Sequence, residues 1–269
     1  MKLQLVPART GVQWVKLGVQ TFWRQPMALA ALFFLAMAGM SLVSLVPFIG
    51  PALALALLPC TSLAMMVASA EATQGRFPTP TLLLVAFRTG RHRMRSMVTL
   101  GLLYAVGFLA IMGLSALVDG GTFAEVYLGG EPMTREIAED PAFQSAMWLS
   151  MALYIPLSLM FWHAPGLIHW HGIAPVKALF FSLVACMRNW RAYLVFGLAW
   201  MAFFLGCGMV LALVTAILAS LIGSIAGGIM VGAAMILAAM FFTSVVFTFR
   251  DSFSAPDASD PTAAELHEG

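Results

Sequence analysis

Thirteen of the fourteen basic residues of this 269-residue chain lie on one side of six long apolar segments. The segments cover residues 26–47, 51–71, 95–118, 144–164, 190–221 and 225–249. Each is long enough for a helix to cross about 30 Å of hydrocarbon. Only 10% of the residues are charged and the mean hydropathy is +0.91, which leaves too few polar side chains to cover a water-soluble surface. The sequence therefore predicts an all-α integral membrane protein with six transmembrane helices.

The basic residues also predict the orientation of these helices. Thirteen of them lie before the first span, between the second and third, between the fourth and fifth, or after the sixth: Lys2, Arg9, Lys16, Arg24, Arg76, Arg88, Arg91, Arg93, Arg95, Lys177, Arg188, Arg191 and Arg250. The exception, Arg135, lies in the loop 119–143, which carries six carboxylates. Lys and Arg are concentrated in cytoplasmic loops. We therefore expect a multi-pass protein with both termini in the cytoplasm and the acidic loop outside.

An internal repeat organises the predicted spans. An offset of 97 residues matches Pro59 with Pro156 and Arg91 with Arg188, and an offset of 67 carries Arg91 back to Arg24. This pattern predicts three parallel helical hairpins, each preceded by an amphipathic helix on the cytoplasmic face, over residues 9–71, 80–164 and 175–249. We expect one membrane domain over residues 1–250 and a disordered acidic cytoplasmic tail over residues 251–269.

The first amphipathic segment shows how such a helix is expected to lie in the membrane surface. One helical face carries Gln13, Lys16, Gln20 and Arg24. The opposite face carries Val12, Val15, Val19, Phe22 and Trp23. Cations facing the headgroups and aromatic rings below them are typical of an interfacial helix.

A cluster of four arginines is the first candidate site. Arg88, Arg91, Arg93 and Arg95 surround the start of the third span. Arginines at a cytoplasmic bilayer surface attract anionic lipid and also fix topology, and the sequence is consistent with both roles. The full set of predicted lipid-headgroup ligands is Arg24, Arg88, Arg91, Arg93, Arg95, Lys177, Arg188 and Arg191.

The other candidates are histidines and prolines. His163, His169 and His171 are possible metal or haem ligands, but their Trp neighbours are more typical of an interfacial aromatic belt, so we predict no metal and no cofactor. Pro59 and Pro156 are expected to kink the second and fourth spans.

Two stretches carry a resemblance to a known family. They are Trp14-Val-Lys-Leu-Gly…Phe22-Trp-Arg-Gln-Pro26 and Ala174-Pro-Val-Lys-Ala-Leu…Met187-Arg-Asn-Trp190. In both, an amphipathic segment ends in a basic–polar turn that leads into a span. Over most of residues 7–250 the chain resembles an uncharacterised family of proteobacterial six-span inner-membrane proteins. More distantly it is similar to the membrane domain fused to some glycerophosphodiester phosphodiesterases. The resemblance implies the bacterial inner membrane and no site residues.

Three functional hypotheses follow from these patterns. The first is a non-enzymatic inner-membrane protein that interacts with anionic lipid or scaffolds a protein partner or a second copy of itself. The alternative is a transporter or exporter of a small or lipid-like molecule, favoured by the prolines and the repeat. A histidine-ligated redox subunit is the third. No phosphate loop, zincin motif or nucleophile elbow is present, and no charged residue lies deep in a span. We therefore expect no enzyme activity and no nucleic-acid partner. Proton- or sodium-coupled transport is disfavoured, although a sodium site can be built from carbonyl and hydroxyl oxygens alone.

Overall fold

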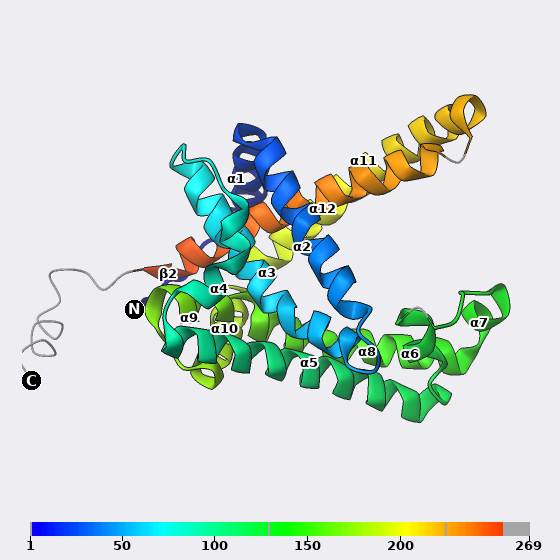
Figure 1. Ribbon diagram of the computed structural model, residues 1–269, viewed down its shortest axis with the longest axis horizontal. Helices are drawn as coiled ribbons and strands as arrows, with labels where there is room; N and C mark the ends of the chain where they lie inside the picture. Colours follow the sequence, from blue (N-terminus) through cyan, green and yellow to red (C-terminus); the bar gives the residue numbers. More distant parts are fainter. Residues whose placement is uncertain (1, 129, 224, 255–269) are drawn as a thin grey trace, which may run out of the picture. The chain divides into compact units, whose positions relative to one another are not determined.

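The computed structural model describes residues 2–128, 130–223 and 225–254 (Figure 1). In this part of the chain six helical segments are long and apolar enough to cross a membrane: Pro26–Ser44, Gly50–Thr73, Arg91–Asp119, Pro141–His171, Trp190–Ala219 and Ile225–Ser252. Each overlaps one predicted span, so the prediction of six membrane-length helices is confirmed. The third begins four residues earlier than predicted, because the helix includes the arginines at its start.

Helices account for nearly all of the described structure. In chain order the elements are β1 (Lys2–Leu3), α1 (Thr10–Arg24), α2 (Pro26–Ser44), α3 (Gly50–Thr73), the 3₁₀ helix η1 (Pro80–Leu84), α4 (Val85–Arg88), α5 (Arg91–Asp119), α6 (Thr122–Tyr127), α7 (Arg135–Glu139), α8 (Pro141–Trp162), α9 (Ala164–His171), α10 (Pro175–Arg188), α11 (Trp190–Ile222), α12 (Ile225–Ser252) and β2 (Phe253–Ser254). The two short strands pair antiparallel, with Lys2 opposite Ser254.

These elements form two compact units. Unit 1 comprises Met1–Met37, Ser62–Leu84 and Val184–Gly269, and unit 2 comprises Ala38–Thr61 and Val85–Leu183. Helices α2, α3 and α10 contribute residues to both. The unit boundaries do not follow the three predicted hairpins, since unit 1 combines the start of the first predicted repeat with the third.

In unit 1, one face of α1 packs against both α11 and α12. Gly11 and Gly18 allow the close approach. A Cβ atom on Gly11 would stand 2.3 Å from the Ala192 carbonyl oxygen, and one on Gly18 would stand 2.4 Å from the Ser244 Cβ. Between them Trp14 is fully buried. The polar residues predicted to share a face are all exposed, as expected, but Val12 and Trp23 are exposed too. The buried face is therefore narrower than the predicted apolar face.

Hydrogen bonds tie the N-terminal segment of unit 1 to its C-terminal end. The Asn189 side chain accepts from the Val6 N–H and donates to the Gln4 carbonyl, both at 2.9 Å. The Trp14 Nε1–H donates to a carboxylate oxygen of Asp251 at 2.9 Å. The predicted disordered tail starts at residue 251, but residues 251–254 belong to the end of α12 and to β2. The rest of the predicted tail, residues 255–269, lies outside the described residues.

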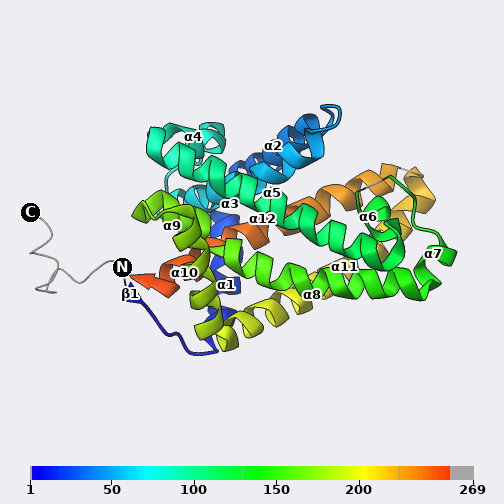
Figure 2. The same ribbon diagram turned by 90° about the horizontal axis from the view of Figure 1, so that it is seen from below.

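In unit 2, α5 lies along α8, and the short helices α6 and α9 pack at opposite ends of α5 (Figure 2). Gly107 of α5 faces Leu157 of α8. The hydroxyls of Tyr104 and Tyr154 join the two helices at 3.2 Å. The third predicted hairpin likewise has its two helices, α11 and α12, packed along each other.

The fourth membrane segment is broken at His163, between α8 and α9. Pro165 follows the break, and a proline ring clashes with the carbonyl four residues earlier, which opens the helix locally. The Ser182 hydroxyl of α10 fills the opening. It accepts from the His163 N–H at 2.9 Å and donates to the Leu159 carbonyl at 2.7 Å. The predicted kink residues Pro59 and Pro156 lie inside α3 and α8, respectively.

The repeat arginines occupy two different kinds of position. Arg24 and Arg188 are each the last residue of a helix, followed by one residue and then a span. Arg91 instead begins a span, and Arg88 is the arginine that ends the preceding helix. At the level of helix boundaries, Arg88 matches Arg24 and Arg188 better than Arg91 does. The predicted superposition of three hairpins stays a prediction.

Candidate functional site

The cationic end of unit 2 is built at the junction of α4 and α5. Arg88 ends α4, and Arg91, Arg93 and Arg95 lie in the first turns of α5. All are exposed except Arg93, which is half-buried. Arg93 lies within electrostatic reach of His169 on α9, which packs against α5. We call the four arginines the cationic cluster.

No carboxylate neutralises this cluster within unit 2. Residues 38–61, 85–118 and 144–183 contain no Asp or Glu. In the described part of the chain none of the four guanidinium groups makes a hydrogen bond or an ion pair, whereas Arg135 and Arg250 are paired with Glu139 and Asp251. The cluster therefore holds four positive charges without a partner from its own unit.

The backbone adds to this positive potential. The cluster surrounds the N-terminus of α5, where the first N–H groups of a helix have no partner in the helix and the macrodipole is positive. The residue before the helix, Gly90, has φ +96° and provides no side-chain cap, and no acidic residue lies in the first turn. Arginines at this end of a helix are electrostatically unfavourable unless an anion joins them.

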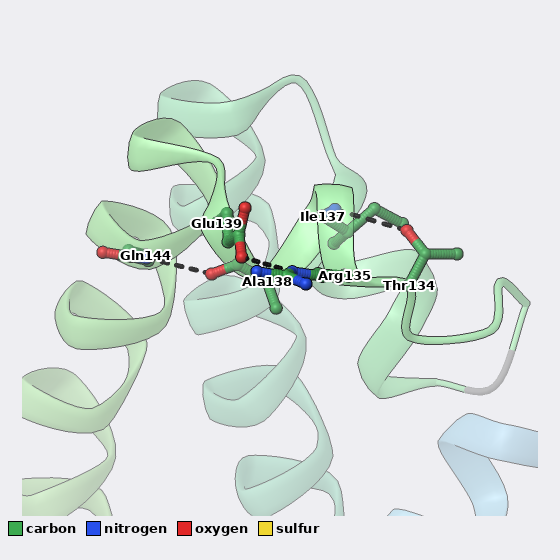
Figure 3. A network of polar contacts seen from close by, with 6 residues as sticks. All are labelled: Thr134, Arg135, Ile137, Ala138, Glu139 and Gln144. Carbon is green, nitrogen blue, oxygen red and sulfur yellow. Dashed lines mark hydrogen bonds and ion pairs between the residues drawn. The ribbon is translucent and has the colours of Figure 1, made fainter.

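The opposite end of unit 2 is acidic and folded (Figure 3). Thr134 caps α7, since its hydroxyl accepts from the Ile137 N–H, and Arg135 pairs with Glu139 at 2.7 Å. Gln144 donates to the Ala138 carbonyl at 2.9 Å and ties α7 to α8. Asp119 accepts from two backbone N–H groups at the start of α6.

The two ends are separated by the thickness of a bilayer. Helix α5 has 29 residues, which at 1.5 Å per residue gives roughly 44 Å. A bilayer including its headgroups is about 40–45 Å thick. A span of this length places the cationic cluster at the headgroup level of one leaflet when the acidic loop lies at that of the other.

The remaining predicted headgroup ligands are dispersed over both units. Lys177, on α10, is exposed in unit 2. In unit 1, Arg24 donates to the Thr73 carbonyl at 3.2 Å, Arg191 lies 5.5 Å from the centre of the Trp190 ring, and Arg188 ends α10. Four of the eight predicted ligands, those of the cationic cluster, therefore lie within eight consecutive residues of unit 2.

The three histidines lie near the break in the fourth membrane segment. His163 is fully buried, His169 is half-buried and His171 is exposed. Among the described residues, no group of three His, Cys, Asp or Glu side chains could hold a metal ion. The predicted absence of a metal and a cofactor stays a prediction.

One serine in unit 2 has a role that sequence reasoning missed. Ser182 bridges the helix break, as described above. Serines are common in membrane helices, and no local pattern marks this one. Pro165, which follows His163, is a local sign that the helix is broken here and that its freed backbone groups need other hydrogen-bond partners.

One curated relative covers almost the whole chain. A protein of Burkholderia thailandensis named a probable inner membrane protein is 39% identical over 264 residues, which are 97% of each chain. No family model matches the chain. No solved structure matches it either. The more distant resemblance to the phosphodiesterase-linked membrane domain stays a prediction.

Proposed function

Because the chain belongs to the family of this probable inner membrane protein, we propose that it is a non-enzymatic inner-membrane protein whose cationic cluster binds anionic lipid headgroups. The observation that carries the proposal is that four neighbouring arginines at one end of a bilayer-length helix have no ion-pair partner among the described residues. In the orientation that the basic residues predict, the cluster and both termini lie at the cytoplasmic surface.

Phosphate groups match the chemistry of this end of unit 2. Guanidinium groups bind phosphate oxygens through two parallel hydrogen bonds. Each cation near an anionic bilayer surface contributes about 1 kcal/mol of attraction. The open N–H groups at the start of α5 provide further donors for a phosphate oxygen. Arginine stems reach along the helix and let the charged groups extend to the headgroups.

We expect the fourfold substitution Arg88→Gln, Arg91→Gln, Arg93→Gln and Arg95→Gln to weaken the preference for anionic lipid by at least tenfold. The reason is the loss of four surface attractions of about 1 kcal/mol each. The measurement is the equilibrium between phosphatidylglycerol and phosphatidylcholine bound to the purified protein, followed by native mass spectrometry. The wild-type preference should shrink at 1 M salt, where the screening length falls to about 3 Å.

The control removes two arginines that already have partners. Arg135→Gln with Arg250→Gln also lowers the positive charge, but these side chains are paired with Glu139 and Asp251. The control should leave lipid preference within about twofold of wild type. An unchanged preference in the fourfold variant, or an equal loss in the control, would refute headgroup binding by the cluster.

A further inference from the structure

The arginines of the cationic cluster do not all lie on one side of α5. Arg91 and Arg95 are four residues apart, so their side chains share one face of the helix. Arg93 is two residues from each, which on a helix of 3.6 residues per turn is roughly the opposite face. Its half-buried side chain lies within electrostatic reach of His169 on α9, which packs against α5. Arg91 and Arg95 therefore form a separate pair.

An anion would relieve the electrostatic repulsion within this pair. Like charges four residues apart on a helix repel each other, and both arginines lie at the positive end of the helix macrodipole. Both side chains are exposed, and neither has a hydrogen bond or an ion pair among the described residues. A phosphate between the two guanidinium groups would accept hydrogen bonds from both and replace the repulsion with two attractions.

Toward the middle of the membrane, the face that carries this pair is apolar and exposed. Val98, Leu102 and Val106 continue the spacing of three or four residues from Arg95, and their exposed fractions are 46%, 54% and 65%. Half of the hydrocarbon thickness is about 15 Å, which corresponds to about ten residues of helix. This apolar surface therefore extends through the depth of one leaflet, where acyl chains lie.

On the face that carries Arg93, α5 is buried instead. Met97, Leu100 and Tyr104 continue that face toward the middle of the helix, and all three are buried. Helix α8 packs along α5, and the Tyr154 hydroxyl of α8 contacts that of Tyr104 at 3.2 Å. Protein thus occupies the place beneath Arg93 that an acyl chain would need.

We propose that Arg91 and Arg95, together with the surface of Val98, Leu102 and Val106, bind one two-chain phospholipid with a negatively charged headgroup. Its phosphate lies between the guanidinium groups and its acyl chains lie along α5. This inference rests on the proposed function and narrows it to one defined place on one helix face. A soluble phosphate ester would satisfy the two cations but leave the apolar surface uncovered. A zwitterionic headgroup would bring a further cation to the pair, which disfavours it.

The experiment locates the bound lipid by photocrosslinking. The full-length protein is placed in phosphatidylcholine nanodiscs with a trace of phosphatidylglycerol or phosphatidylcholine that carries a diazirine in one acyl chain. Mass spectrometry measures crosslinks to residues 98–109 of α5. Residues 148–155 of α8 serve as the internal reference, since Trp148, Met151 and Ile155 are also exposed. In the wild type, phosphatidylglycerol should exceed phosphatidylcholine at least tenfold at α5 and less than twofold at α8.

Arg95→Gln and Arg93→Gln form the matched pair of variants, because each removes one positive charge from the cluster and they lie two residues apart on opposite faces. One cation near an anionic headgroup changes the affinity about fivefold. Arg95→Gln should therefore lower the enrichment at α5 about fivefold, and Arg91→Gln combined with Arg95→Gln should remove it. Arg93→Gln should change it less than twofold.

An excess of glycerol 3-phosphate tests the alternative ligand, with sodium chloride at the same ionic strength as the reference. The enrichment at α5 should be equal in the two solutions, and its loss in glycerol 3-phosphate would show that the pair binds a free phosphate ester instead of a lipid. Equal losses in Arg93→Gln and Arg95→Gln, or equal enrichment at α5 and α8, would overturn the defined site but leave headgroup attraction by the whole cluster standing. No enrichment at either helix would overturn both.

Discussion

Replacing Gly11 with alanine is expected to destabilise the protein by about 1–3 kcal/mol, although alanine is the better helix former. The added Cβ would stand 2.3 Å from the Ala192 carbonyl oxygen and 2.6 Å from the Phe196 nitrogen. Both are backbone atoms of α11, so no side chain can rotate away to make room. The strain must separate α1 from α11 and disturb the packing of Trp14.

The same substitution at Gly197 is the control, because it should have the opposite sign. Gly197 lies inside α11, and nothing approaches its Cβ position within 4 Å. Gly197→Ala should therefore stabilise the helix by about 0.5–1 kcal/mol. Unfolding in mixed micelles with increasing dodecyl sulfate, followed by tryptophan fluorescence, measures both variants. If the two changes have the same sign and size, α1 does not pack on α11 as described.

Replacing Ser182 with alanine is expected to cost about 2–4 kcal/mol, because two buried hydrogen bonds are lost together. The Ser182 hydroxyl is fully buried and joins the His163 N–H and the Leu159 carbonyl across the break between α8 and α9. Water does not readily replace the hydroxyl, because it is shielded from solvent by the surrounding protein. The same unfolding measurement applies.

Ser158→Ala is the control for this prediction. The Ser158 hydroxyl makes one hydrogen bond, to the Ile155 carbonyl of its own helix, and lies nearer the surface. Its removal should change stability by no more than about 0.5 kcal/mol. A similar small effect for Ser182→Ala would show that the hydroxyl does not hold the broken helix together.

Residue type and spacing were sufficient to predict the membrane helices. Long apolar runs bounded by charges leave little freedom, since every backbone polar group inside a bilayer must be satisfied within a helix. The exposed polar face of α1 was also predictable, because residues three and four apart share a helical face. The partner of α1 was not. Gly11 and Gly18 are not hydrophobic, so an apolar pattern does not reveal that they allow close backbone contact.

Contacts between distant parts of the chain account for the other differences. Trp14 and Asp251 are 237 residues apart, and nothing local to either indicates their hydrogen bond. The cationic cluster was predictable because its four arginines lie within eight consecutive residues. The bridge that Ser182 forms across the helix break was not, since it depends on a contact of α10 with the end of α8. Charge patterns along the chain thus predicted the cationic cluster, whereas packing alone revealed the bridging serine.

The most direct test of this account is which side of the membrane each end of α5 faces. Single cysteines at Gln74 and Glu131, in a background lacking Cys60, Cys186 and Cys207, place one exposed label on each side of the span. A membrane-impermeant maleimide should label Glu131→Cys in intact cells and Gln74→Cys only after permeabilisation. Labelling of Gln74→Cys in intact cells would contradict the cytoplasmic placement of the cationic cluster.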